Sequence, residues 1–451
     1  HEDRDFGRIL ELLDEDSEHP EVISLRTEAT AHILSPSDAL EAIDRIDATN
    51  WSEEHRLMLL SSELTSLSKM GDWNTAIKKC RQGLVENPDS LRFKIVLARV
   101  LRISGDVEAA NSQLDEIVAG LPSDATMAER VEIATEYRQL GNHDQIVVLL
   151  EDQVSTQHDS EALRLLLSAL ISGQKHRRAL NLFNVFPPEL SSDEWYLRAR
   201  SILAINSGAA DIENHLNAYL RVEPNDLEMQ ISRLGLWQLQ GRESEIGRKL
   251  RTFEKKIPEG NPLERMRLCH LAVQYGNRKW GVDTAYQELI LNWDDPAIHL
   301  AYQGLILMYD DLEDAIPKAA EIQENCVFET RSSDGVRRAR IEGTNAHNFE
   351  AERHAPTSEF AKACIGKTVG EKFVIATQYE SIEFEVLWIK PRVLDLLHKS
   401  LEEFNKRFPT NSGMQRMTFD FQADNPLVDM ERITKAAHDR DQSVLDNYAA
   451  N

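Results

Sequence analysis

Residues 71–90, GDWNTAIKKCRQGLVENPDS, and residues 105–124, GDVEAANSQLDEIVAGLPSD, are two copies of one pattern. Each copy begins with glycine and has an alanine five residues later and a proline seventeen residues later. Glycine accepts the strained backbone of a tight turn between two helices, the small residue lets those helices approach, and the proline ends the second one. The pattern therefore predicts two helix–turn–helix pairs in tandem.

The same glycine recurs far beyond these two copies. The steps from each glycine to the next are 34, 36, 32, 35, 33 and 35 residues. The glycines are Gly71, Gly105, Gly141, Gly173, Gly208, Gly241 and Gly276. A period near 34 residues is typical of helical solenoids, whose helix pairs bury their apolar faces only by stacking on their neighbours. We expect each of these glycines to form the turn within a helix pair, although the pattern weakens near Gly208 and Gly276.

These residues resemble the tetratricopeptide repeat (TPR) family over roughly residues 20–325. The resemblance implies a mainly α-helical solenoid over residues 1–325, with about seven to nine helix pairs and a protein partner on its concave face. Residues 19–34 and 35–46 predict a further pair before the first good one. Residues 296–309 and 311–323 predict the last pair.

Composition excludes several classes of function. The formal charge of −25 over 451 residues disfavours direct binding of nucleic acid or of anionic lipid. We interpret the charge as a solvated surface; the alternative is an acidic groove for a basic partner segment. Four scattered cysteines, no apolar stretch of about 18 residues and no signal peptide predict a cytoplasmic protein without disulfides, metal or cofactor.

The helical period stops after residue 324. Residues 325–344 alternate around the turn-forming SSDG and predict a hairpin, residues 357–366 predict a short helix, and residues 367–377 and 381–390 predict two more strands. We expect a compact α+β domain over residues 326–390. A mainly helical segment follows over residues 391–451, beginning with an amphipathic helix at residues 391–408.

Residues 354–391, HAPTSEFAKACIGKTVGEKFVIATQYESIEFEVLWIKP, resemble the C-terminal domain of bacterial Gre-type transcript-cleavage factors. The matching positions are Pro356, Ser358, Ala361, Ile365, Gly366, Lys367, Gly370 and Glu371. The resemblance implies an FKBP-like fold and docking on RNA polymerase near its secondary channel. Chemically the motif is mainly structural, because proline and serine start a helix and the glycines supply turns.

Transcript cleavage is not carried over from this resemblance. Gre factors carry their acidic residues on a coiled coil, whereas this chain has a solenoid there, and Asp310 and Asp311 lie in a predicted helix connection.

We predict no catalytic residue. His438–Asp441 and Cys269–His270 lack further ligands, residues 366–372 lack the spacing of a phosphate loop, and the carboxylates Asp420, Asp424, Asp429 and Glu431 are interpreted as solvated helix caps.

Arg337, Arg338 and Arg340 form the compact basic cluster of the small domain. In a strand Arg338 and Arg340 share a face, with Arg337 opposite. We interpret the cluster as protection of an edge strand by charge; docking of an anionic partner is the alternative.

The resulting hypothesis is a non-enzymatic, prokaryotic protein–protein interaction scaffold. The combination of repeats with a Gre-like domain resembles proteins of nucleic-acid conflict and antiviral defence systems in which a PIN-type ribonuclease domain can follow. The expected partners are therefore RNA polymerase or a nuclease or defence protein, and self-association remains open. The alternatives are a polymerase-associated transcription regulator and a fragment or subunit of a PIN-type ribonuclease.

Overall fold

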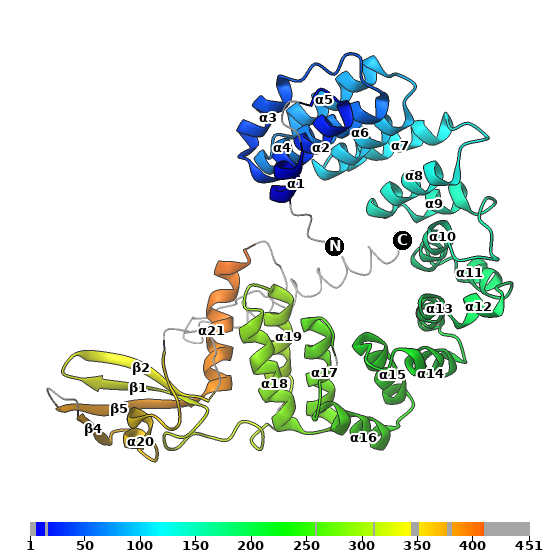
Figure 1. The fold of residues 1–451 in the computed structure, drawn as a ribbon. Helices are drawn as coiled ribbons and strands as arrows, with labels where there is room; N and C mark the ends of the chain where they lie inside the picture. The colour runs from blue at the N-terminus through cyan, green and yellow to red at the C-terminus, as the bar shows by residue number, and fades with distance from the viewer. Residues whose placement is uncertain are drawn as a thin grey trace, which may run out of the picture. The chain divides into compact units, whose positions relative to one another are not determined.

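The computed structural model describes residues 6–13, 17–257, 259–309, 312–343, 351–376 and 381–409. The chain folds as two compact units, unit 1 (His1–Val222) and unit 2 (Glu223–Asn451), and each is described here by itself. The described residues of unit 1 form helices and no strands, whereas those of unit 2 combine helices with a five-stranded sheet (Figure 1).

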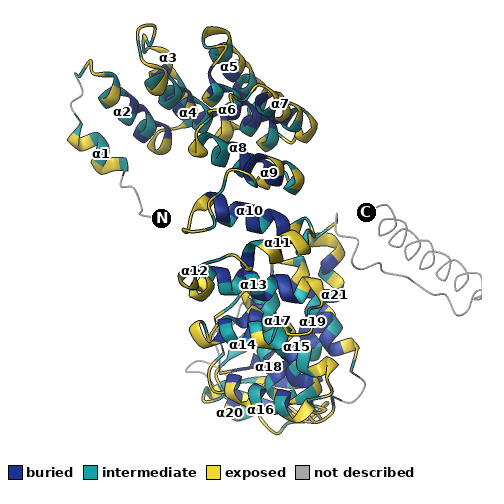
Figure 2. Ribbon diagram, turned by 90° about the vertical axis from the view of Figure 1, so that its right-hand side faces the viewer, coloured by how far each residue is buried: buried dark blue, intermediate teal, exposed yellow. Residues whose placement is uncertain are grey.

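The helices of unit 1 follow one another as antiparallel pairs. They are α1 (Phe6–Leu12), α2 (Pro20–Ile33), α3 (Pro36–Asp44), α4 (Glu53–Met70), α5 (Trp73–Glu86), α6 (Leu91–Ile103), α7 (Val107–Ala119), α8 (Met127–Gln139), α9 (His143–Leu150), α10 (Glu161–Ser172), α11 (His176–Phe183), α12 (Pro188–Ser192), α13 (Glu194–Ser207) and α14 (Ile212–Val222). The first helices of successive pairs also contact one another, as α6 contacts α8 and α8 contacts α10. Helix α10 is buried around most of its circumference (Figure 2). This is the stacking that the 34-residue period predicts.

The glycine turns are confirmed at five of the seven predicted positions. Gly71, Gly105, Gly141, Gly208 and Gly241 have φ between 64° and 92°, the left-handed region that other residues adopt at a cost. In the two quoted copies the following aspartate caps the second helix: Asp72 accepts from the Thr75 N–H and Asp106 from the Ala109 N–H, each at 3.1 Å. The alanines of the pattern, Ala76 and Ala110, are fully buried.

The expected strained turn is wrong at Gly173 and Gly276, whose φ values are −79° and −133°. After α10 the left-handed residue is Gln174, with φ of 55°. Close packing explains the first glycine instead, because a Cβ at Gly173 would lie 2.8 Å from the Ala169 carbonyl oxygen. At Gly276 a Cβ would lie 3.2 Å from Cδ1 of Leu250.

Unit 2 begins with five more helices of the same kind. They are α15 (Leu227–Leu239), α16 (Glu243–Phe253), α17 (Pro262–Tyr275), α18 (Arg278–Leu291) and α19 (Pro296–Leu307). The sheet domain follows with β1 (Cys326–Ser332), β2 (Gly335–Ile341), β3 (Glu352–His354), α20 (Glu359–Cys364), β4 (Lys372–Ala376) and β5 (Ser381–Pro391), and the last described helix is α21 (Arg392–Arg407).

The sheet has the strand order β3-β2-β1-β5-β4. The two predicted hairpins are confirmed: β1 pairs antiparallel with β2 from Cys326↔Ile341 to Ser332↔Gly335, and β4 pairs antiparallel with β5. Strand β3, parallel to β2, was not predicted, because three residues carry too little alternation to be recognised. Helix α20 covers one face, where Ala361 and Cys364 pack against Phe328 and Phe373.

The helix predicted over residues 311–323 is wrong. Residues 313–315 form a turn and most of residues 316–323 have irregular backbone; Pro317 lacks the N–H of a helix and disfavours helical backbone at Ile316. The segment instead joins the sheet domain: the Ile322 N–H donates to the Lys367 carbonyl and the Ile322 carbonyl accepts from the Gly366 N–H, both at 2.8 Å.

Helix α21 takes the place beside α19 that the missing helix would fill. Its residues Val393, Leu396 and Leu397 lie in one apolar core with α17, α18 and α19. The Tyr302 hydroxyl of α19 donates to the Val393 carbonyl at 2.9 Å. The sheet domain is therefore inserted between a repeat helix and its packing partner. Residues 410–451 of the predicted helical segment, with Asp420, Asp424, Asp429, Glu431 and His438–Asp441, lie outside the described residues, as do Asp310 and Asp311.

A buried polar cluster also joins α19 to α21. The Nε2–H of His299 donates to the Trp293 carbonyl at 2.7 Å, so its Nδ1 accepts from the Ser400 hydroxyl at 2.8 Å. The Gln303 side-chain amide donates to the same hydroxyl at 2.7 Å. Burial lowers the pKa of His299 below its ordinary value, which favours the neutral imidazole that these hydrogen bonds require.

We expect unit 2 to lose stability below about pH 6.5. The unfolded chain takes up a proton on each histidine there, whereas burial lowers the pKa of His270, His299 and His354, so the folded protein takes up fewer protons. Stability from this source is complete above pH 6.5 and falls with pH by at most about 1.4 kcal/mol per pH unit for each histidine. Urea unfolding at pH 7.5 and 5.5 measures the slope. His299→Gln should flatten it, and an unchanged slope would contradict the role given to His299.

A second prediction concerns Gly83 in α5. A Cβ at this position would lie 2.5 Å from Cε1 of Phe93, which is itself buried in α6. Gly83→Ala should therefore lower the free energy of unfolding of unit 1 by about 1–3 kcal/mol, although alanine is the better helix former. The control is Gly235→Ala in α15, where nothing lies within 4 Å and a gain of about 0.5–1 kcal/mol is expected. Urea unfolding monitored by circular dichroism compares the two, and equal stabilisation would refute the steric argument.

Candidate interaction surfaces

A mostly apolar groove of about 350 Å³ lies between α4 and α6 in unit 1. Its lining comes from the first helices of two successive pairs and from the start of α5. The lining residues are Leu57, Ser61, Leu64, Thr65, Ser68, Lys69, Trp73, Val96, Arg99, Val100 and Ile103. Ile103, the last residue of α6, is 49% exposed.

The cationic side chains of this groove are anchored by neighbouring helices. Lys69 donates to the Ala31 and His32 carbonyls at 2.7 and 3.2 Å, at the end of α2. Arg99 pairs with Glu136 of α8 at 2.6 Å, and Arg102 pairs with the other oxygen of Glu136 at 3.2 Å. These contacts fix the lining without creating an acid–base pair for catalysis, so the groove is suited to holding an apolar segment.

The cysteine thiols of the described residues are buried. Among them no group of three or more His, Cys, Asp or Glu side chains is placed to hold a metal ion. Burial raises the pKa of Cys80 to about 12, that of Cys326 to about 11 and that of Cys364 to about 12, so these thiols stay protonated at neutral pH. Within the same part of the chain no helix is both long and apolar enough to cross a membrane.

The predicted basic cluster does not form one surface. Arg340 is 3% exposed and faces Glu342 at 3.8 Å, while Arg338 donates to Asp395 of α21 at 2.6 Å and lies over the Trp388 ring. Arg337 is exposed and pairs with Asp334 at 3.4 Å. The edge-strand interpretation is wrong for Arg340, because β3 pairs with β2 at Ala339–Ile341; Arg337 and Arg338 lie beyond the residues that β3 covers. The shared face of Arg338 and Arg340 is confirmed, but it faces the helices of unit 2. Docking of an anionic partner here stays a prediction.

The Gre-like motif has the local geometry expected of its residues. The Ser358 hydroxyl caps α20 by accepting from the Ala361 N–H at 3.1 Å, directly after Pro356. Gly366 and Gly370 have φ of 82° and 85°.

Hydrogen bonds hold the loop between α20 and β4. The Lys367 carbonyl accepts from Ile322, Glu371 accepts from the Thr368 N–H at 2.7 Å, and the Gly370 N–H donates to the Val386 carbonyl at 2.8 Å. Ile365 remains 44% exposed, so it is the apolar member of the motif that a partner can reach.

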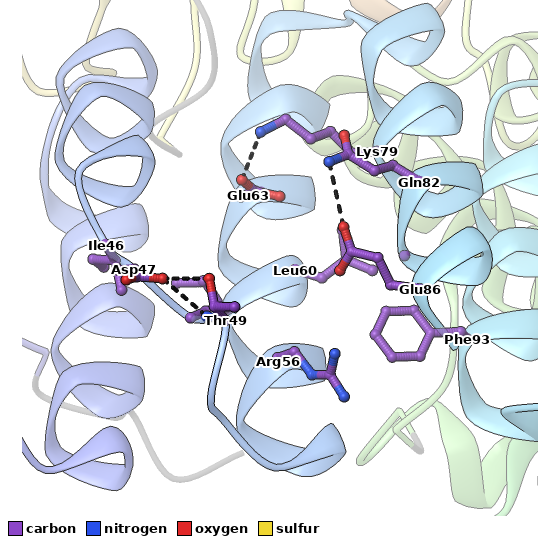
Figure 3. Close-up of a pocket in the computed structure, with 13 residues that line it drawn as sticks. Ile46, Asp47, Thr49, Arg56, Leu60, Glu63, Lys79, Gln82, Glu86 and Phe93 are labelled. Atoms are coloured by element: carbon purple, nitrogen blue, oxygen red, sulfur yellow. Dashed lines mark hydrogen bonds and ion pairs between the residues drawn. The ribbon is translucent and has the colours of Figure 1, made fainter. Parts of the chain in front are cut away.

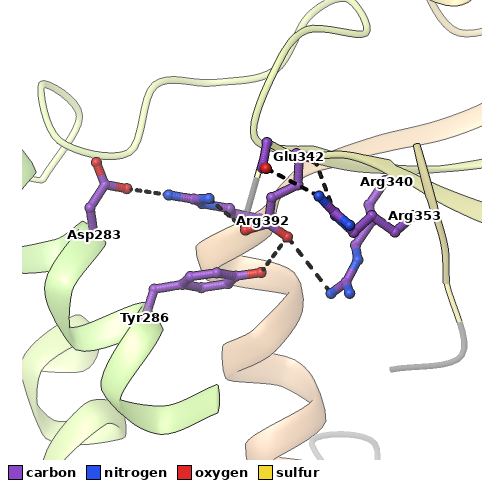
Figure 4. A network of polar contacts seen from close by, with 7 residues as sticks. Asp283, Tyr286, Arg340, Glu342, Arg353 and Arg392 are labelled. Atoms are coloured by element: carbon purple, nitrogen blue, oxygen red, sulfur yellow. Dashed lines mark hydrogen bonds and ion pairs between the residues drawn. The ribbon is translucent and has the colours of Figure 1, made fainter. Parts of the chain in front are cut away.

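A network that sequence reasoning missed joins the sheet domain to the repeat helices (Figure 4). Arg392, the first residue of α21, donates to Glu342 at 2.6 Å and to Asp283 of α18 at 2.8 Å, and its guanidinium lies 4.4 Å from the Tyr286 ring centroid. Glu342 is 1% exposed and also accepts from the Tyr286 hydroxyl at 3.4 Å. These residues come from segments up to 109 positions apart, so no local pattern marks them.

Comparison with known proteins shows only remote likeness. No family model and no curated protein matches the chain. A tetratricopeptide repeat protein from Parabacteroides merdae has a TM-score of 0.39 and 15% identity, over 55% of this chain and 97% of that one. The structure of Naa15/Naa10 bound to HypK-THB has a TM-score of 0.27 and 13% identity, over 69% of this chain and 58% of that one. These TM-scores are too low to show a shared fold. The TPR-like character of the helical region is seen in its own glycine-centred helix pairs.

Removing Arg392 should loosen the sheet domain. Arg392→Met removes the guanidinium that donates to the buried Glu342 at 2.6 Å, and we expect a loss of about 2–4 kcal/mol. The matched control is Arg407→Met, also in α21, whose partner Asp294 is exposed and whose loss should cost less than about 1 kcal/mol. Hydrogen exchange by mass spectrometry locates the effect: β2 and α21 should exchange faster and α4–α6 should not. Equal exchange in the two variants would show that the junction is not held by this pair.

Proposed function

We propose that this chain is a non-enzymatic protein–protein interaction scaffold that holds an apolar segment of a partner in the groove between α4 and α6. The observation that carries the proposal is the apolar lining of that groove, in which Ile103 is exposed and Leu57, Leu64, Trp73 and Val96 are half-buried. A helix presenting apolar side chains at i, i+3 and i+4 fits such a groove and would remove these surfaces from water.

The small domain is proposed as a second docking module. One support is the resemblance of its sequence to the Gre C-terminal domain, and the proposal includes an FKBP-like fold for it. The other is that the apolar side chains Ile365, Val369 and Val374 are exposed. These side chains are 44%, 57% and 53% exposed. The proposed partner at this surface is RNA polymerase; a nuclease or another defence protein is the alternative.

Capture experiments with the full chain test the groove. Ile103→Glu should reduce capture of the groove partner at least about tenfold, because a carboxylate would be buried against apolar side chains. Val148→Glu in α9, a site 74% exposed and outside the groove, should leave capture unchanged. Mass spectrometry identifies the proteins that distinguish the two variants. If the same proteins are recovered with both, the groove is not the binding surface.

The same experiment reads out the small domain separately. Val369→Glu should remove its partner, while Val336→Glu, 54% exposed in β2, serves as the control. Polymerase subunits lost only with Val369→Glu would support the transcription role, and their retention with both variants would reject it.

A further inference from the structure

A second cavity of unit 1, of about 490 Å³, lies between the loop of residues 46–49 and the helices α4, α5 and α6 (Figure 3). It is separate from the groove between α4 and α6, since the two share no lining residue. Its apolar wall includes Ile46, Leu59, Leu60 and Phe93, and it has the size of a site for a small ligand or for one or two side chains.

Most charged groups around this cavity already have a partner. Lys79 donates to Glu63 at 2.8 Å and to Asp44 at 3.2 Å. Asp47 accepts from the Thr49 N–H at 3.0 Å and from the Thr49 hydroxyl. Glu86 accepts one long hydrogen bond, from Gln82 at 3.5 Å. Lys79 and Asp47 are therefore committed, and Glu86 keeps capacity to accept another hydrogen bond.

Arg56 is the exception. It extends from α4 into the cavity (Figure 3), its Nε is buried, and no described residue accepts a hydrogen bond from it or pairs with it. A guanidinium whose terminal N–H groups have no protein partner can donate to a ligand, and a planar carboxylate matches its fork of donors. The cavity thus presents an unpaired arginine side chain beside an apolar wall.

We propose that this cavity binds a peptide carboxylate that carries an adjacent apolar side chain. The carboxylate pairs with Arg56, the apolar side chain lies against Leu60 and Phe93, and a backbone N–H of the peptide donates to Glu86. The inference rests on the proposed scaffold function and adds a second contact of stated chemistry to it.

The charge around the cavity selects a monoanion over a phosphate. Asp47, Glu63 and Glu86 all line the cavity, against the two cations Arg56 and Lys79. A dianionic phosphate would be repelled by these carboxylates, whereas one carboxylate placed at Arg56 is opposed less. Glu86 also favours a ligand that brings an N–H donor, which a peptide does.

Binding of defined probes to the full chain tests the proposal. N-acetyl-L-phenylalanine has the carboxylate, the amide N–H and the ring, and its carboxamide replaces the charged carboxylate by a neutral amide. We expect the acid to bind with a Kd near 1 mM, and the carboxamide at least about tenfold more weakly, by saturation-transfer NMR. N-acetyl-Glu-Phe-amide supplies a side-chain carboxylate instead, and the tighter of the two acids identifies the source of the carboxylate. Phenyl phosphate is the dianionic comparison.

Variants assign the binding to Arg56. Arg56→Gln should weaken binding of the acid about tenfold or more, with an unchanged melting temperature, while Arg92→Gln, an exposed arginine of α6 outside the cavity, should leave it unchanged. Four outcomes would each overturn the proposal. They are equal binding of acid and carboxamide, tighter binding of phenyl phosphate, unchanged binding by the Arg56→Gln variant, and no binding up to about 10 mM. Ile103→Glu should not change probe binding, so a failure here is distinguishable from a failure of the groove.

Discussion

The buried ion pair between Arg392 and Glu342 holds the two architectures of unit 2 together. One guanidinium reaches a carboxylate that follows β2, a second carboxylate on α18 and the ring of Tyr286, from the first position of α21. A charge this deeply buried is tolerated only when its partners are fixed. The network therefore ties the orientation of the sheet to that of the repeat helices.

The position of α21 makes the sheet domain an insertion within the repeat helices. Because α21 packs on α18 and α19, the chain leaves the repeat helices, forms the sheet domain and returns to the same apolar core. Two connections and a buried polar cluster around His299 then join the domain to the helices. A small sheet attached by a single linker would reorient freely, whereas an inserted domain with buried contacts to the helices is restrained at both of its ends.

The repeat helices use charge in a comparable way. Glu136 of α8 is 4% exposed at its side chain and accepts from two arginines of α6, so one carboxylate fixes the register of two successive helix pairs. The same arginines limit which parts of the α4–α6 groove remain apolar and available. In the cavity beside it Arg56 has no such partner, and this difference separates a structural arginine from one available to a ligand.

The sequence by itself determined the elements that depend on local chemistry. The glycine period placed the helix pairs, the SSDG turn placed the first hairpin, and Pro356, Ser358 and the two following glycines placed α20 and its loop, because turns and caps are set within a few residues. Only the tertiary structure decided what depends on distant segments. It showed that residues 312–323 join the sheet domain and form no helix, and that α21 packs where that helix was expected. It also showed that Arg338 and Arg340 face the helices of unit 2 and that Arg56 has no protein partner. The periodicity of a segment and the charge of its side chains are local properties. The hydrogen-bond acceptor that a side chain meets comes from a distant segment that the fold brings beside it.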